Sequence, residues 1–164
     1  MTFIKKILVT AGIGSVIAGI LYAFRLKRTR AELETQAAVT VKKLDTKGLS
    51  LQIEITLKNP TRSTFKVKFP FVKVYYKDSL LGTSQVIDKD IDVPSFGQIK
   101  ASNIIVQLPL SSLLAVGSGL TNLLSSGQPL VFKVETISTI NLGVAQIPYT
   151  KENEFNLKLP TNAS

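Results

Sequence analysis

Three aspartates at alternate positions are the first residues whose spacing suggests a chemical function. Asp88, Asp90 and Asp92 would place their carboxylates on one face of an extended strand, and carboxylates are ligands that Ca²⁺ prefers. The calcium-loop pattern fails, because Val93 and Ile99 stand where that loop needs Gly and Glu. The outer two carboxylates would also lie roughly 13 Å apart. We therefore expect a solvated strand face whose charges prevent edge pairing, with a Ca²⁺ site as the alternative.

A basic stretch interleaved with aromatic residues is the second suggestive pattern. Its members are Lys66, Lys68, Lys73 and Lys77 among Phe65, Phe69, Phe71, Tyr75 and Tyr76. Cations beside stacking rings can bind single-stranded nucleic acid, and lysines can bind an anionic partner or a lipid surface. In the first half of the stretch, strand alternation alone would turn the rings toward a core and the lysines toward water. We expect a solvated face and no nucleic-acid partner, since no arginine cluster accompanies it.

The composition removes most catalytic constellations. The chain of 164 residues contains no Cys and no His. It therefore has no thiolate nucleophile, disulfide, serine–histidine triad, or thiolate or imidazole metal site. Gly117-Ser118-Gly119 has no following Lys and is no phosphate-binding loop. We expect a protein that is not an enzyme and needs no cofactor.

Positive charge is concentrated at the N-terminus. The net charge is +9, from 20 Lys and Arg against 11 Asp and Glu. Residues 1–30 contain no acidic residue and six basic ones, which are Lys5, Lys6, Arg25, Lys27, Arg28 and Arg30. These bracket residues 7–24, ILVTAGIGSVIAGILYAF, an uncharged run of 18 residues. A helix of this length covers roughly 27 Å, close to a bilayer's hydrocarbon core of roughly 30 Å.

We expect residues 7–24 to form an uncleaved single-pass membrane anchor, with the six cations at the lipid headgroups. A cleavable signal peptide would need small residues after the run, whereas Phe24 is followed directly by RLKRTR. A buried core helix would be amphipathic, and this run is apolar all round. Lys5, Lys6 and the amino terminus precede the run and four basic residues follow it, a difference of about one charge that favours a domain on the cytoplasmic side.

Small residues recur at every fourth position of the run. They form two adjacent series, Thr10, Gly14 and Ala18, and Ala11, Ser15 and Gly19. Such a face lets two helix backbones approach closely, so it could pack against another membrane helix or a second copy of the chain. The abundance of small residues in membrane spans explains the same pattern without any partner. Both interpretations stay open.

The rest of the chain predicts strands. Residues 31–38 lack Gly and Pro and predict a helical stalk or linker. From Val39 apolar residues recur at every second position, most regularly over residues 49–57. Further strands are predicted at 65–69, 72–76, 83–93, 99–108, 130–140, 143–147 and 154–159, with turns at 45–48 and 78–82. A helix capped by Ser111 or Ser112 is predicted to include Leu124 and to end at Gly127.

The order of landmarks resembles the type 2 late-embryogenesis-abundant family, also called the water-stress and hypersensitive-response domain. In LQIEITLKNP, Asn59-Pro60 is similar to the family's Asn-Pro after an amphipathic strand. FPFVKVYYKDSLLGTSQV, IDVPSFGQIKASNIIVQLPLSSLL and TINLGVAQIPYTKENEF are similar to its later elements. The resemblance covers residues 39–159. It implies an immunoglobulin- or fibronectin-like antiparallel β-sandwich, a link to stress protection and partner binding, and no catalytic residues.

We therefore expect four segments, which are a membrane anchor with basic flanks at 1–30, a stalk or linker at 31–38, a mostly β sandwich with one short helix at 39–160, and a tail at 161–164. The expected function is a structural or protein-interaction role at a lipid bilayer. Its partners would be other membrane or assembly proteins, including copies of itself, in a lipid-containing virion or an envelope complex. Two alternatives stay open, namely a desiccation protectant and a binder of lipid or small apolar ligands between the sheets.

Overall fold

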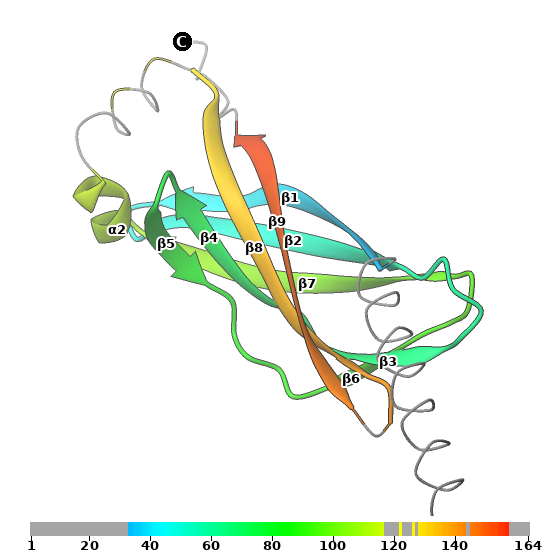
Figure 1. The fold of residues 1–164 in the computed structure, drawn as a ribbon. Coiled ribbons are helices and arrows are strands. Elements are labelled where there is room, and N and C mark those ends of the chain that lie inside the picture. The colour runs from blue at the N-terminus through cyan, green and yellow to red at the C-terminus, as the bar shows by residue number, and fades with distance from the viewer. Residues whose placement is uncertain (1–32, 117–121, 123–125, 127, 144, 158–164) are drawn as a thin grey trace, which may run out of the picture.

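The computed structural model describes residues 33–116, 122, 126, 128–143 and 145–157, called the described residues below. Nine strands and a short helix lie within them (Figure 1). Their bounds are β1 (Glu34–Asp45), β2 (Gly48–Lys58), β3 (Phe65–Lys68), β4 (Phe71–Tyr76), β5 (Ser79–Thr83), β6 (Asp90–Val93), β7 (Gln98–Pro109), α2 (Leu110–Ala115), β8 (Leu130–Asn141) and β9 (Gln146–Leu157).

The strands form two antiparallel sheets that face one another (Figure 1). The smaller sheet has the order β1-β2-β7. In the larger sheet β3 and β4 share one edge of β8, β9 runs along the other edge, and β6 and β5 lie outside β3 and β4. The predicted mostly β, two-layer antiparallel architecture with a short helix is confirmed.

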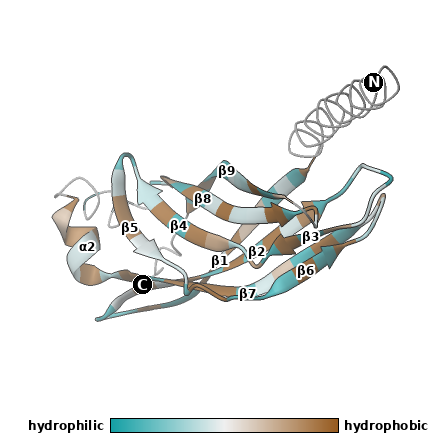
Figure 2. Cartoon of the chain, turned by 60° about the horizontal axis from the view of Figure 1, so that its bottom comes forward, coloured by the Kyte–Doolittle hydropathy of each residue, from teal (hydrophilic) through white to brown (hydrophobic). Residues whose placement is uncertain are grey.

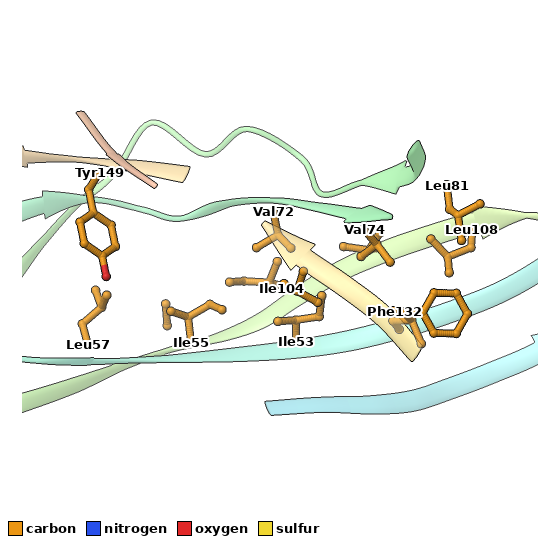
Figure 3. Packing of buried hydrophobic residues seen from close by; sticks show 14 of the residues in the cluster. Ile53, Ile55, Leu57, Val72, Val74, Leu81, Ile104, Leu108, Phe132 and Tyr149 are labelled. Carbon is orange, nitrogen blue, oxygen red and sulfur yellow. The ribbon is translucent and has the colours of Figure 1, made fainter. Parts of the chain in front are cut away.

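The core lies between the two sheets and follows from the period-two pattern. Along β2 the side chains of Leu51, Ile53, Ile55 and Leu57 have no exposed area, while the residues between them are half-buried. Figure 3 shows Ile53, Ile55 and Leu57 facing side chains of the larger sheet, among them Val72, Val74 and Phe132. Figure 2 shows the same alternation as bands of hydropathy along the strands. Burial of this continuous apolar surface is the main term that stabilises the fold.

The strand predicted over residues 83–93 is wrong in its middle. The structure has β5, then a loop over residues 84–89, then β6. The loop lies beside Pro70, which separates β3 from β4 and has no N–H to give to a ladder. Two backbone hydrogen bonds, from Ser84 N to Val72 O (2.8 Å) and from Phe69 N to Lys89 O (2.7 Å), attach the two ends of this loop to the neighbouring chain.

The predicted turn over residues 45–48 is confirmed. Asp45 ends β1, its carboxylate accepts a hydrogen bond from Lys47 N (2.9 Å), and Gly48 begins β2. Gly48 has a φ of +132°, and a Cβ atom there would collide with the carbonyl oxygen of Leu108, so only glycine fits. The turn predicted over residues 78–82 is too long, because β5 already begins at Ser79.

The helical stalk predicted for residues 31–38 does not extend over residues 34–38, which form the first part of β1. Glu34 pairs with Lys58 and Ala38 with Glu54 along the edge of β2. The sandwich therefore begins before Val39. Pairing with β2 outweighs the helix propensity of this segment, because a ladder satisfies its backbone and buries Thr35.

Two further predictions need correction. The last two predicted strands are one strand, β9, which runs through Pro148; β9 pairs only with β8 among the described residues, and an edge strand tolerates proline. Helix α2 begins after Pro109, and no side chain caps it, so Ser111 and Ser112 lie inside the helix. The predicted continuation of this helix falls mostly outside the described residues.

The predicted anchor, its two small-residue series, its six flanking cations and the C-terminal tail lie outside the described residues. Among the described residues, no helix has the length and apolar character needed to cross a bilayer.

Candidate interaction surface

The three aspartates singled out in the sequence face the lysines of the neighbouring strand. Strand β3 pairs with β6, so that Lys66 lies opposite Asp92 and Lys68 opposite Asp90. The Lys68 ammonium lies 2.7 Å from an oxygen of Asp88 and 3.1 Å from one of Asp90, and Lys66 lies 3.6 Å from Asp92. Lys68 lowers the pKa of Asp88, and the pKa of Lys68 is raised chiefly by Asp88 and then by Asp90.

These contacts make the outer face of β3 and β6 a row of exposed ion pairs. The carboxylates considered for Ca²⁺ are therefore shared with ammonium groups. Among the described residues, no group of three or more acidic side chains is placed to hold a metal ion. Exposed pairs of this kind contribute little to stability. They nevertheless engage the three aspartates and the first two lysines of the basic stretch with one another.

The second half of the basic stretch is engaged in a similar way on β4 and β8. Lys73 lies 3.6 Å from Glu135, which also accepts a hydrogen bond from the hydroxyl of Tyr75 (3.1 Å). Lys133 lies 5.1 Å from the centre of the Tyr75 ring and 3.5 Å from Glu152. The outer face of the larger sheet is thus largely occupied by its own cross-strand contacts.

The inward orientation expected for the rings in the first half of the stretch is confirmed for Phe65, which is buried, and Phe69 packs partly buried against the core. The rings of the second half, for which no orientation was predicted, divide between the two faces. Phe65 and Tyr76 are buried in the core, as is Phe132, which lies 5.8 Å from Tyr76 between ring centres. Phe71 and Tyr75 instead share the half-buried outer face with Lys73. The alternation shifts by one residue between β3 and β4, so Phe71 and Tyr75 fall on the outer face while Tyr76 falls on the core face.

The beginning of β1 and two loops come together at one end of the sandwich, called the proximal end here. Glu34 pairs with Lys58, and Lys58 pairs with Gln98. The proximal end thus consists of the start of β1, the β2–β3 loop (residues 59–64) and the β6–β7 loop (residues 94–97), as Figure 1 shows. Helix α2 lies at the opposite end (Figure 1).

Asn59 joins the two proximal loops. Its side-chain amide is buried and donates to the carbonyl oxygens of Ser63 and Pro94, both at 2.9 Å. Its side-chain oxygen accepts from Thr61 N (3.0 Å) and Thr61 Oγ1 (2.7 Å), and its backbone N–H donates to Gly97 O (2.8 Å). A buried amide with partners on both loops fixes their relative position.

The β6–β7 loop that Asn59 fixes presents Phe96 to solvent. The side chain is 68% exposed, and its backbone has a φ of +50°. That conformation is rare for a bulky residue and costs about 1–3 kcal/mol. A hydrogen bond from Phe96 N to Thr61 O (3.0 Å) and the contacts of Asn59 maintain this loop conformation. A depression of about 360 Å³ beside the ring is lined by Glu34, Lys58, Asn59, Pro60, Phe96, Gly97 and Gln98.

Tyr149 ties the first strand to the larger sheet near the same end. Its hydroxyl lies 2.6 Å from Thr35 Oγ1 and donates to Leu33 O (3.3 Å). Figure 3 shows the ring reaching across the core beside Leu57. Burial raises the pKa of the Tyr149 phenol. The first described residues of the chain are thereby held to both sheets.

A second pocket lies at the edge of the sandwich. It measures about 480 Å³ and opens between β7 and the loop after β5, with lining residues that include Phe69, Ser84, Ile87, Asn103 and Ile105. Its lining contains both polar and apolar residues. The space between the sheets themselves is occupied by the buried cluster in Figure 3. The binding of an apolar ligand between the sheets stays a prediction.

Sequence reasoning missed the residues that organise the proximal end. The sequence patterns place Pro94–Gly97 only between two predicted strands, and they mark Asn59 only as part of the Asn-Pro landmark after an amphipathic strand. The available signal was an aromatic residue in a Pro-Ser-Phe-Gly turn, where small and polar residues are usual. No local signal marked the Tyr149 contact.

Comparisons with known proteins concern the fold. No protein-family model matches the chain, and no curated protein matches it. The solution structure of an Arabidopsis thaliana protein is 16% identical, with a TM-score of 0.55 over 76% of this chain and 79% of that chain. This likeness shows a shared fold.

Two other solved structures are less similar. The crystal structure of a protein from Archaeoglobus fulgidus is 15% identical, with a TM-score of 0.48 over 77% of this chain and 98% of that chain. The solution structure of a protein described as a candidate late embryogenesis abundant protein is 13% identical, with a TM-score of 0.38 over 92% of this chain and 88% of that chain.

Proposed function

We propose that the chain is a single-pass, membrane-anchored β-sandwich protein without catalytic activity. Its role is structural or interactive, as a membrane component of a larger assembly such as a lipid-containing virion or an envelope complex. One observation carries this proposal. The uncharged run at residues 7–24 has basic flanks, and only residues 25–32 separate it from Leu33, the residue that precedes β1.

The short connection supports a domain held close to the bilayer. Residues 25–32 would cover roughly 12 Å as a helix and roughly 28 Å fully extended. At the end of this connection that meets the domain, Tyr149 holds Leu33 and Thr35 through hydrogen bonds of its hydroxyl. A membrane tether that ends in a buried link between both sheets suits a structural role.

Membrane extraction tests the anchor. The full chain is expected to stay with membranes after a carbonate wash, and Ile13→Lys with Ile17→Lys is expected to release it. Each lysine at the centre of a span costs about 2.5–3.5 kcal/mol of insertion free energy. Ile13→Leu with Ile17→Leu is the matched control and should stay bound. Release of the unmodified chain by carbonate would contradict the anchor.

Crosslinking tests whether copies of the chain are partners. The chain has no Cys, so a single introduced thiol reports one position. Gly14→Cys lies on the small-residue face, and Val16→Cys lies roughly 160° away on a helix. We expect oxidation in membranes to yield a dimer from Gly14→Cys and little from Val16→Cys. Equal yields would contradict a specific packing face and leave other membrane proteins as the partners.

The family resemblance supports a second candidate function. Asn59-Pro60 is the strongest element of that resemblance, and Asn59 is the residue that joins the proximal loops. An immunoglobulin- or fibronectin-like sandwich of the type 2 late-embryogenesis-abundant kind would act in desiccation. The test dries a sensitive enzyme with vesicles that carry the full chain or with empty vesicles. Equal loss of enzyme activity in both samples would count against this function.

A further inference from the structure

We infer that the β6–β7 loop is a second membrane contact, in which Phe96 inserts its ring among the lipid headgroups of the bilayer that holds the anchor. This contact rests on the proposed anchoring and adds to it a defined lipid-facing surface of the folded domain. Three independent features of the proximal end support it, and they are position, conformation and charge.

The position of the loop places it beside the start of the tethered strand. Phe96 and Glu34 line the same depression, and Gln98 is joined to Glu34 through the paired residue Lys58. Only eight residues separate Leu33 from the uncharged run. A tether of roughly 12–28 Å therefore holds this end of the sandwich near the headgroups. The proximity is the same whichever side of the membrane carries the domain.

The conformation of Phe96 is that of a rigid projection. A turn with φ near +50° is formed without strain by Gly and with little strain by Asn, yet this position carries an aromatic ring that is 68% exposed. Bonds from Phe96 N to Thr61 O and from Asn59 to Pro94 and Gly97 hold the loop in place. Neither core packing nor turn formation requires the ring, and aromatic rings favour the headgroup region.

The charges around the loop suit an anionic lipid surface. Arg62, on the neighbouring loop, is exposed, and Lys58 is half-buried. Among the described residues, neither has an acidic partner within ion-pair distance. Glu34 is the acidic residue at the rim of the depression. Unpaired cations beside an inserted ring add electrostatic attraction to anionic headgroups.

A single tryptophan can report the contact, because the chain contains none. The probe is full-length Phe96→Trp in vesicles of phosphatidylcholine and phosphatidylglycerol, with and without brominated acyl chains. Leu114→Trp is the matched control, since Leu114 is 53% exposed on α2 at the opposite end. We expect brominated lipid to quench the tryptophan fluorescence of the Phe96→Trp chain. We also expect its emission maximum to lie at a shorter wavelength in vesicles than in detergent. The fluorescence of the Leu114→Trp control should show neither change.

The outcomes separate the two proposals. Vesicle flotation of the chain with equal quenching at both positions would overturn the loop contact and leave the anchoring intact. Failure of the chain to float with vesicles would overturn the anchoring and the contact together. Should Phe96→Trp fail to fold, as judged by circular dichroism, Ser95→Trp places the reporter on the same loop with Phe96 unchanged. Absence of quenching there would overturn the contact equally.

Discussion

The hydroxyl of Tyr149 lies 2.6 Å from Oγ1 of Thr35, a residue 114 positions earlier in the chain. Tyr149 belongs to β9 of the larger sheet and Thr35 to β1 of the smaller one. Both side chains are buried, and the same hydroxyl donates to Leu33 O. The contact therefore closes the sandwich at the point where the described chain begins.

Loss of this hydroxyl should destabilise the domain. Tyr149→Phe keeps the ring but leaves the hydroxyl of Thr35 and the carbonyl of Leu33 without their partner, which costs about 1–3 kcal/mol of unfolding free energy. Urea unfolding of the full chain in detergent micelles measures it. Thr35→Val should cost a similar amount, and the double variant should cost less than the sum. Additive effects would mean that the two groups do not interact.

The same tyrosine predicts a pH dependence at alkaline pH. Burial raises the pKa of Tyr149 in the fold, so the neutral phenol is favoured there. Its stabilising effect is fully present below the ordinary phenol pKa of about 10 and is lost as pH rises through the higher pKa of the folded state. Stability should therefore fall at high pH in the unmodified chain and fall less in Tyr149→Phe. Identical pH profiles would contradict this assignment.

Removal of the Asn59 amide should loosen the proximal end. Asn59→Ala removes the buried amide that donates to the carbonyl groups of Ser63 and Pro94 on the two loops, and it removes the side-chain oxygen that accepts from Thr61 N. We expect a loss of about 1–3 kcal/mol of unfolding free energy, because each of these hydrogen bonds contributes about 0.5–1.5 kcal/mol. Asn141→Ala is the matched control. Its side chain makes one exposed hydrogen bond, to Gly143 N, so it should change stability by less than about 1 kcal/mol. Equal losses would disprove the role of Asn59.

A buried hydroxyl on β8 should be dispensable. Thr136 has no exposed area, and its Oγ1 has no hydrogen-bond partner among the described residues. Thr136→Val keeps the shape and removes the unsatisfied group, so it should raise the unfolding free energy by about 1 kcal/mol. Thr139→Val, which is half-buried on the other face, should have little effect. A destabilised Thr136→Val would mean that the hydroxyl has a partner in solution.

The strain at Phe96 should be measurable by itself. Phe96→Gly removes the penalty of a positive φ and should raise the unfolding free energy by about 1 kcal/mol. Phe96→Ala removes the ring but keeps the Cβ atom, so it should bring no such gain. Thermal unfolding of the two variants in detergent compares them directly. Equal stabilities would show that this backbone is not strained.

Much of the sandwich could be predicted from local patterns. Alternation along residues 49–57 and 130–140 indicated β2 and β8 together with their buried faces, since the side-chain period of a strand is local. The extent of β1 and β9 could not be predicted, because pairing with a neighbour outweighed helix propensity at residues 34–38 and a proline at position 148. The interruption at residues 84–89 could not be predicted locally, because it lies beside Pro70 in the connection between β3 and β4.

The sequence by itself determined the absence of Cys and His, the uncharged N-terminal run with its basic flanks, and the period-two strands. Only the tertiary structure decided that Asp90 faces Lys68, that Asn59 joins two loops, and that Tyr149 reaches Thr35. These contacts join residues distant in sequence. Their geometry depends on how two twisted sheets pair and pack, which no local pattern of residues specifies.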